Sequence, residues 1–306
     1  GKETFSFLQS QTTNDVLQMQ IGQGQNSAVT DRQARLIANF SIHRMGEDEA
    51  LILVETSLKD ILLNHLESYH FREEVEFTAL NCRLLALQGP KSSLILEKVF
   101  ENQNLPDKPN DNTQLTLGEH PINLIIKSLT GEEGQILCFP NELEDELTQL
   151  ILKSDSPPIK VNEVAREVLR IEAGIPIYDT DMDKKNILPE TGLEHTSVSY
   201  NKGCYIGQEV IARIKTYGAP NFALMGLTVE GVLTPPYNGT LKLGDKKIGT
   251  IKSSVRSVTL DKVITLAYLH KEHRSPDIEM EVTIDGKPFK VKTCLLPFYQ
   301  AQTRKD

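Results

Sequence analysis

The chain has 306 residues, of which 39% are hydrophobic and 25% are charged, and its formal net charge is −9. This length suits two domains or one large one, and the composition is that of a globular protein with a substantial core. The net negative charge and the absence of tryptophan argue against an extended nucleic-acid-binding surface. No apolar run has the roughly 18 residues of a membrane helix and no secretory pattern opens the chain, so a cytoplasmic protein is predicted.

The four cysteines lie far apart and form no CxxC pair, which argues against a disulfide framework and against a closed zinc site. Cys82, Cys138 and Cys294 fall inside apolar runs, so we expect them to be buried thiols in a reducing compartment. Cys204 differs from them because it lies in a polar stretch that contains two glycines.

The first part of the chain alternates between helical and strand patterns. Residues 5–19 predict two short helices joined by a turn. The apolar runs 36–43 and 50–55 are separated by a polar turn, which predicts a β-hairpin. Residues 57–69 then place apolar side chains on one face, which predicts a helix.

The next part repeats this order. A strand at 83–88 and a helix at 92–100 precede the polar, proline-containing segment 101–113, which we interpret as a linker. Two strands, 122–128 and 135–139, and a helix that starts at Asn141 follow it. Hairpin followed by helix therefore occurs on both sides of the linker, which predicts an α+β fold built from two related halves.

The last part begins with a helix over 162–173 and an irregular acidic segment over 177–196. Such a segment is either functional or a solvated loop, and its spacing leaves both readings open. Short strands with regular turns then predict a small β-barrel or sandwich. We place the boundary near residues 218–221, which gives domains 1–217 and 218–306.

The octapeptide Lys202–Glu209 (KGCYIGQE) is the stretch with the clearest chemistry. A thiolate is a useful nucleophile or ligand when a nearby cation or a helix N-terminus lowers its pKa. Lys202 is close enough in sequence to do this for Cys204, and residues 209–215 read either as a helix or as a strand. The alternative is a glycine-rich turn that holds an incidental cysteine, and spacing alone does not choose between these readings.

The octapeptide resembles a motif of the YgfZ family of folate-binding proteins, which are similar to the glycine-cleavage T-protein, an aminomethyltransferase. Further stretches agree with this family in order, which extends the resemblance over nearly the whole chain. They are Phe7–Gln11, Thr13–Val16, Arg170–Pro176 and Leu188–Leu193.

This resemblance implies a tetrahydrofolate-binding body of two ferredoxin-like halves and a C-terminal small β-barrel. It also implies a role in the assembly or repair of iron–sulfur proteins, including radical enzymes that thiolate tRNA, with iron–sulfur proteins and assembly factors as partners. Cys204 and Lys202 inherit the functional weight of the family motif, as a reactive thiol and the cation that lowers its pKa. Tyr205, Gln208 and Glu209 are expected folate contacts.

Folate chemistry suggests further residues. A pterin presents two neighbouring N–H donors that one carboxylate can accept, and the anionic tail favours Arg or Lys. In the T-protein the pterin-binding Glu lies in a Thr-Gly-Glu-x-Gly loop, which matches Glu132 here, and an Arg of the T-protein matches Arg166. Arg170 is one helical turn further on. The alternatives are a plain hairpin turn for Glu132 and structural ion pairs for the two arginines.

One position departs from the T-protein. The T-protein has a functional Asp pair where this chain has Ala38 and Asn39, so a carboxylate for proton handling is missing there. The leading hypothesis is therefore a tetrahydrofolate-binding protein that supports iron–sulfur cluster assembly. The alternatives are a folate-dependent aminomethyltransferase of the T-protein type and a non-catalytic scaffold.

Overall fold

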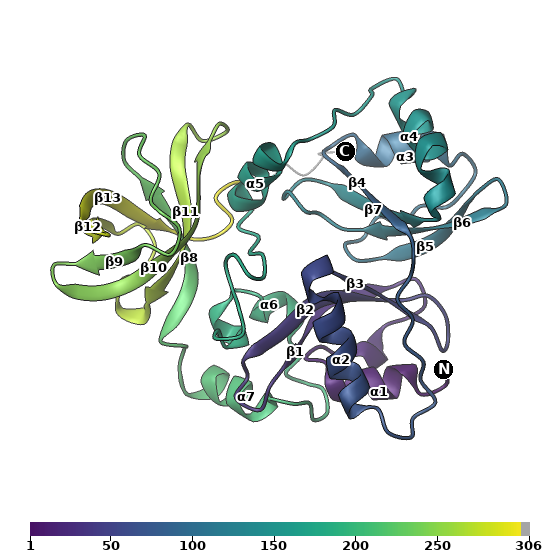
Figure 1. Ribbon diagram of the computed structural model, residues 1–306, viewed down its shortest axis with the longest axis horizontal. Coiled ribbons are helices and arrows are strands. Elements are labelled where there is room, and N and C mark those ends of the chain that lie inside the picture. The colour runs from purple at the N-terminus through teal and green to yellow at the C-terminus, as the bar shows by residue number, and fades with distance from the viewer. Residues whose placement is uncertain (301–306) are drawn as a thin grey trace.

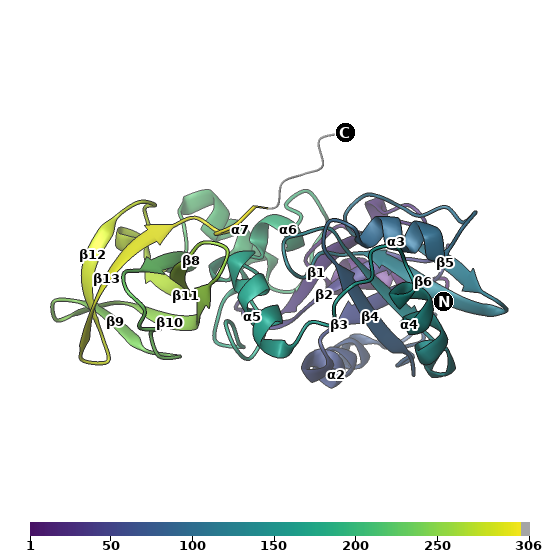
Figure 2. The same cartoon turned by 90° about the horizontal axis from the view of Figure 1, so that it is seen from above.

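The computed structural model describes residues 1–300. A β-barrel lies at one end, two sheet-containing units lie side by side at the other, and helix α5 lies between barrel and sheets (Figure 1). Figure 2 shows the same arrangement from above. Within the described residues, no helix is long and apolar enough to cross a membrane.

The N-terminal unit is an antiparallel sheet in the order β1-β2-β3 with helices packed against it. Strand β2 is the central strand, and six of its nine residues are buried. Strand β1 was not predicted, since its first half is Gly-Gln-Asn-Ser and lacks apolar alternation. The elements are α1 (Thr4–Gln11), the 3-10 turn Val16–Gln18, β1 (Gly24–Thr30), β2 (Leu36–Arg44), β3 (Ala50–Val54), the 3-10 turn Thr56–Leu58 and α2 (Lys59–Tyr69).

The second unit is a sheet in the order β4-β7-β6-β5 with its own apolar core. The predicted linker 101–113 does not separate two halves, because β4, which precedes it, pairs with β7, which follows it. The end of that segment instead enters a strand. The elements are β4 (Arg83–Gln88), α3 (Ser92–Val99), β5 (Asn112–Leu117), β6 (His120–Ile126), β7 (Gly134–Phe139), the 3-10 turn Asn141–Leu143 and α4 (Glu144–Leu152).

The chain then returns to the N-terminal unit. Tyr178, Leu188, Tyr205 and Ile211 are buried in the same apolar cluster as β1 and β2. Residues 209–215, for which the sequence allowed either a helix or a strand, are helical. The elements are α5 (Glu163–Glu172), the 3-10 turn Leu188–Glu190, α6 (Glu194–Ser197) and α7 (Gln208–Tyr217).

The C-terminal part is a closed six-stranded barrel in the order β10-β11-β8-β13-β12-β9. Closure leaves the sheet without free edges, and apolar side chains fill its interior. Helix α5 packs against the outside of the barrel through Ile171. The elements are β8 (Phe222–Val229), β9 (Thr240–Leu243), β10 (Lys246–Ser257), β11 (Lys262–His270), the 3-10 turn Lys271–His273, β12 (Glu279–Ile284) and β13 (Lys287–Cys294).

The predicted fold class is therefore confirmed: an α+β body and a small C-terminal barrel. The short strands predicted after residue 218 are the six strands of the barrel, and the first of them begins at Phe222. Residues 301–306 of the predicted second domain lie outside the described residues.

Candidate functional site

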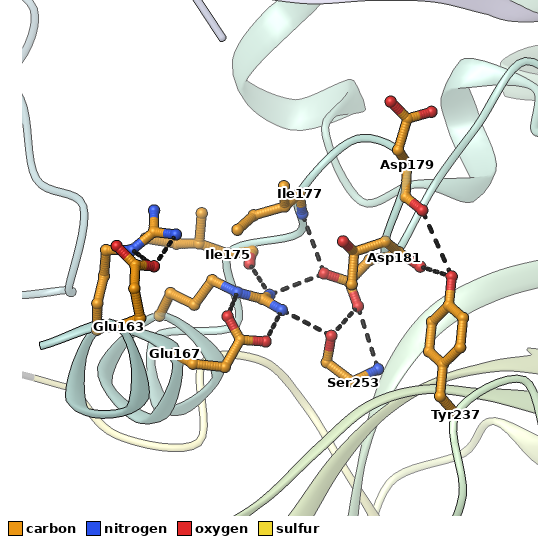
Figure 3. Close-up of polar contacts among 11 residues, drawn as sticks. Glu163, Glu167, Ile175, Ile177, Asp179, Asp181, Tyr237 and Ser253 are labelled. Atoms are coloured by element: carbon orange, nitrogen blue, oxygen red, sulfur yellow. Dashed lines mark hydrogen bonds and ion pairs between the residues drawn. The ribbon is translucent and has the colours of Figure 1, made fainter. Parts of the chain in front are cut away.

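A polar network joins α5, the following loop and the barrel (Figure 3), and its hydrogen bonds converge on the guanidinium of Arg170. Helix α5 starts where the Asn162 side chain accepts a hydrogen bond from the Ala165 N–H at 2.8 Å. The arginine lies two turns further along and is only 3% exposed. Its five N–H donors are all used: they reach both carboxylate oxygens of Glu167, the Ile175 carbonyl, Asp181 and Ser253.

Asp181 is the buried anion of this network. Its carboxylate accepts a hydrogen bond from Arg170 at 2.7 Å and from the Ile177 N–H at 3.0 Å. The N–H and hydroxyl of Ser253 on β10 donate to its other oxygen. The network joins three parts of the chain and leaves Arg170 no donor for a ligand. The structure thus favours the structural alternative for Arg170 over the predicted folate contact.

Arg166 lies one turn earlier on α5 and is far more accessible. Its guanidinium pairs with Glu163 at 2.7 Å, and the two side chains are 53% and 82% exposed. An exposed pair of this kind contributes at most about 1 kcal/mol and exchanges readily with water. Arg166 therefore remains free to bind an anion, and its folate role stays a prediction.

Glu132 lies in the loop between β6 and β7, close to the C-terminal end of α5. Gly131 has a φ of 84°, and a side chain there would come within 2.9 Å of the Ala173 Cβ. This close approach fixes the loop on α5. The interaction of Glu132 with the Tyr299 hydroxyl raises the pKa of Tyr299. Within residues 1–300, no Lys or Arg forms an ion pair with Glu132.

Arg166 and the loop that carries Glu132 lie along one face of α5. Residues seven apart on an α-helix differ in direction by only about 20°, so Arg166 and Ala173 lie on one face, about 10 Å apart along the axis. Glu132 borders one end of this face and Arg166 the other. A carboxylate without an ionic partner matches the N–H edge of a pterin, and a guanidinium matches the tail carboxylates.

The Lys202 ammonium lies among backbone carbonyls, and its role toward Cys204 stays a prediction. Its ammonium donates to three carbonyl oxygens, those of Gln9, Thr12 and Asn14. These bonds use all three N–H donors. Burial lowers the pKa of Lys202 to about 8, and Asp15 opposes this shift. Lys202 thus fastens the octapeptide to the N-terminal segment.

Cys204 is exposed and lies three residues before Gly207, the N-cap of α7. It borders a hollow of about 330 Å³ together with Arg32, Tyr69 and Tyr205, and Glu132 is not among its lining residues. The thiol and the proposed pterin anchor therefore do not share this hollow. The larger hollow, of about 570 Å³, lies over β8, β12 and β13 of the barrel and contains none of the predicted residues.

The other predicted folate contacts of the octapeptide have different environments. Tyr205 is 8% exposed, its ring lies 5.2 Å from the Lys202 ammonium, and burial raises its pKa to about 12. Gln208 is half-buried in the first turn of α7, and Glu209 is exposed beside it. Their roles in folate binding stay predictions.

The remaining cysteines are only partly as expected. Cys138 is buried, whereas Cys82 and Cys294 are half-buried. The sulfur atoms of Cys82 and Cys138 are 2.9 Å apart, and burial raises the pKa of Cys138 to about 12. In the described part of the chain, no three His, Cys, Asp or Glu side chains are grouped so as to hold a metal ion.

Sequence reasoning missed Glu55, which follows β3 and faces α5. Arg166 and Arg170 on α5 and Asp179 and Asp181 in the next loop all act on its ionisation. Its partners lie more than 100 residues away along the chain, so no local pattern could have revealed it. Asn39, on the neighbouring strand β2, has a buried side-chain oxygen without a hydrogen-bond partner among the described residues.

Comparison with known proteins adds a family to this geometry. Residues 1–202 match the GCVT N-terminal domain, and residues 223–300 match the glycine cleavage T-protein C-terminal barrel domain. The chain is 27% identical to an aminomethyltransferase of Bacillus cytotoxicus over 98% of this chain and 83% of that protein. It is 27% identical to one of Thermus thermophilus over 97% and 82%.

The fold also matches a solved structure. The glycine cleavage system aminomethyltransferase T from Bartonella henselae superposes with a TM-score of 0.89 at 21% identity, over 98% of this chain and 82% of that one. The predicted membership of the YgfZ family is wrong, because the matched domains and the named relatives are those of the glycine cleavage T-protein.

Proposed function

The chain belongs to the glycine cleavage T-protein family, and we propose that it binds tetrahydrofolate and transfers an aminomethyl-type one-carbon group to it. The family uses tetrahydrofolate. The observation that supports the proposal most is the Glu132 carboxylate, which lacks an ionic partner in residues 1–300 and lies where the β6–β7 loop meets α5. This was the alternative hypothesis at the level of sequence. No comparison supports an iron–sulfur role.

Glu132 would orient the folate by accepting two N–H bonds from the pterin edge, a charge-assisted pair with defined geometry. Arg166 would exchange its solvent-exposed partner Glu163 for a carboxylate of the folate tail. Arg170 would act at a distance, because its network fixes α5, and thereby Arg166, against the barrel. When bound, tetrahydrofolate supplies the nitrogen atoms that accept the one-carbon group.

A transferase also needs a group that moves protons at the reacting nitrogen atoms. Ala38 and Asn39, at the place of the Asp pair of the T-protein, do not ionise. The proposed activity therefore requires a carboxylate from another segment of the chain. The predicted role of Cys204 as a nucleophile is not needed for this activity and stays a separate prediction.

The test is turnover. The chain is incubated with tetrahydrofolate and an aminomethylated lipoyl-protein, and the released ammonia and the methylene-tetrahydrofolate formed are measured. We expect both products in equal amounts, with a rate that saturates in tetrahydrofolate. Glu133→Gln, a change in the neighbouring residue of the same loop, serves as the control and should retain the rate. Product formation no faster than in the absence of the protein would refute the transferase proposal.

A further inference from the structure

Strand β3 pairs with β2, the strand on which Ala38 and Asn39 replace the Asp pair, and a glutamate follows β3 directly. Strands β2 and β3 are antiparallel, and their register pairs Phe40 with Val54 and Ser41 with Leu53. Extrapolating this register by one residue, past the end of β3 at Val54, places Glu55 opposite Asn39. Residues directly opposite each other point to the same face, with Cβ atoms about 5 Å apart. The extrapolated register therefore puts the Glu55 side chain on the same face of the sheet as Asn39, where the Asp pair is missing.

The Glu55 carboxylate has no hydrogen-bond or ion-pair partner among the described residues. The backbone carbonyl of Glu55 accepts the Leu58 N–H at 2.9 Å. A buried carboxylate with a structural role normally accepts hydrogen bonds from N–H groups or pairs with a cation. This one is held at a fixed place by the end of β3 and the turn after it, yet it remains available to exchange a proton.

The charges that face Glu55 come from two segments. Arg166 and Arg170 of α5 favour its ionised form, whereas Asp179 and Asp181 of the following loop disfavour it. Burial is the largest influence, and the net result is a raised pKa. Asp179 is held in the left-handed region with a φ of 64°, and its carboxylate is drawn without a partner in Figure 3. A general base benefits from a pKa raised toward neutrality.

We propose that Glu55 is the proton-exchanging carboxylate of this protein, supplied by β3 in place of the acid that β2 lacks. The proposal rests on the proposed transferase function. Two N–C bonds to tetrahydrofolate form while the C–S bond to the lipoyl carrier and the C–N bond to the amine break, and one of the two N–H protons ends on the lipoyl sulfur. The carboxylate takes the other proton from a tetrahydrofolate nitrogen, which breaks an N–H bond and forms an O–H bond. The same proton then passes to the nitrogen of the departing amine, so Glu55 ends the cycle ionised as it began.

The test combines stability, binding and turnover in three variants. Glu55→Gln removes the charge and keeps the shape. Glu55→Gln combined with Asn39→Asp moves the carboxylate across to β2. Glu49→Gln, an exposed Glu in the turn at the other end of the same hairpin, is the matched control. Each is measured for its urea unfolding midpoint from pH 4 to 8, its tetrahydrofolate affinity by calorimetry, and its turnover.

A glutamate with a raised pKa in the folded state binds protons more tightly when folded, so its contribution to stability is lost as the pH rises through that pKa. We therefore expect Glu55→Gln to raise the unfolding midpoint at pH 8 and to leave it unchanged at pH 4, unlike Glu49→Gln. Turnover should fall by about 100-fold or more, while tetrahydrofolate affinity changes less than about threefold. The double variant should recover at least tenfold of the lost rate.

The outcomes separate this inference from the proposed function. If the wild-type chain neither binds tetrahydrofolate nor turns over, the proposed function has failed. If the wild-type chain is active and Glu55→Gln keeps its rate, Glu55 is not the proton-exchanging group. A loss of rate without the pH-dependent gain in stability, or without recovery in the double variant, would also overturn the proposal, since it indicates a merely structural effect.

Discussion

Replacing Arg170 by alanine is the most informative test of how the three parts of the chain are held together. The substitution leaves the Asp181 carboxylate, which is fully buried, without its cation. Asp181 keeps the hydrogen bonds from Ile177 and from the Ser253 N–H and hydroxyl. Breaking a buried pair from one side typically costs about 3–5 kcal/mol, because an uncompensated charge remains.

The same helix supplies the control. Arg166→Ala removes the same side chain from an exposed i,i+3 pair and should cost no more than about 1 kcal/mol. Stability is measured by urea unfolding, followed by circular dichroism because the chain has no tryptophan. Hydrogen exchange of α5 and β10 locates the loss. Adding Asp181→Asn to Arg170→Ala should restore part of the stability.

Equal losses in the two arginine variants would refute this reasoning. So would a loss in Arg170→Ala that appears only in the sheet units and leaves exchange in α5 and β10 unchanged. A further loss on adding Asp181→Asn would show that the buried charge is not the cause.

Three further predictions concern His43, Lys202 and Glu132. Burial lowers the pKa of His43 to about 4, so between pH 6.5 and pH 4 only the unfolded chain binds a proton at this residue. The free energy of unfolding should therefore fall by about 3 kcal/mol as the pH falls from 6.5 to 4. An equal pH dependence of stability in His43→Gln would contradict this. Lys202→Met should cost about 1–3 kcal/mol in urea unfolding, because three carbonyls lose their donor. The alkylation rate of Cys204, followed by mass spectrometry, should stay the same in that variant, and a tenfold slower reaction would show that Lys202 is the activating cation. Glu132→Gln should weaken tetrahydrofolate binding by about 1–3 kcal/mol, the contribution of a charged hydrogen bond.

Local patterns predicted the parts of the fold that depend on neighbouring residues. The barrel strands alternate and are separated by turns, and α5 has an Asn cap at one end and Gly174 with a φ of 68° at the other. Strands β1 and β5 were missed because they are polar, and pairing with their neighbours stabilises them more than their own composition does. The return of residues 175–217 to the N-terminal core is a long-range contact that no periodicity encodes.

The candidate site shows the same limit. Glu132 was predicted from a loop motif, which is a local pattern, and its folate role stays a prediction. Lys202 was assigned to Cys204 because the two are close in sequence, whereas its ammonium reaches carbonyls about 190 residues earlier in the chain. The role that we propose for Glu55 had no local pattern to predict it, because the proposal depends on strand register and on a helix from another segment. The octapeptide and the shorter stretches that agreed with it pointed to the wrong family, and matches over both domains corrected this.

A calorimetric titration of the chain with tetrahydrofolate is the most direct test of the central claim. The wild-type protein should bind one equivalent, and Glu132→Gln should bind about 5- to 150-fold more weakly. Glu133→Gln, with the same change one residue later, should bind like the wild type. No measurable binding by the wild-type protein, or equal affinities for the wild type and Glu132→Gln, would contradict the account of this protein as a folate-dependent transferase with Glu132 as its pterin anchor.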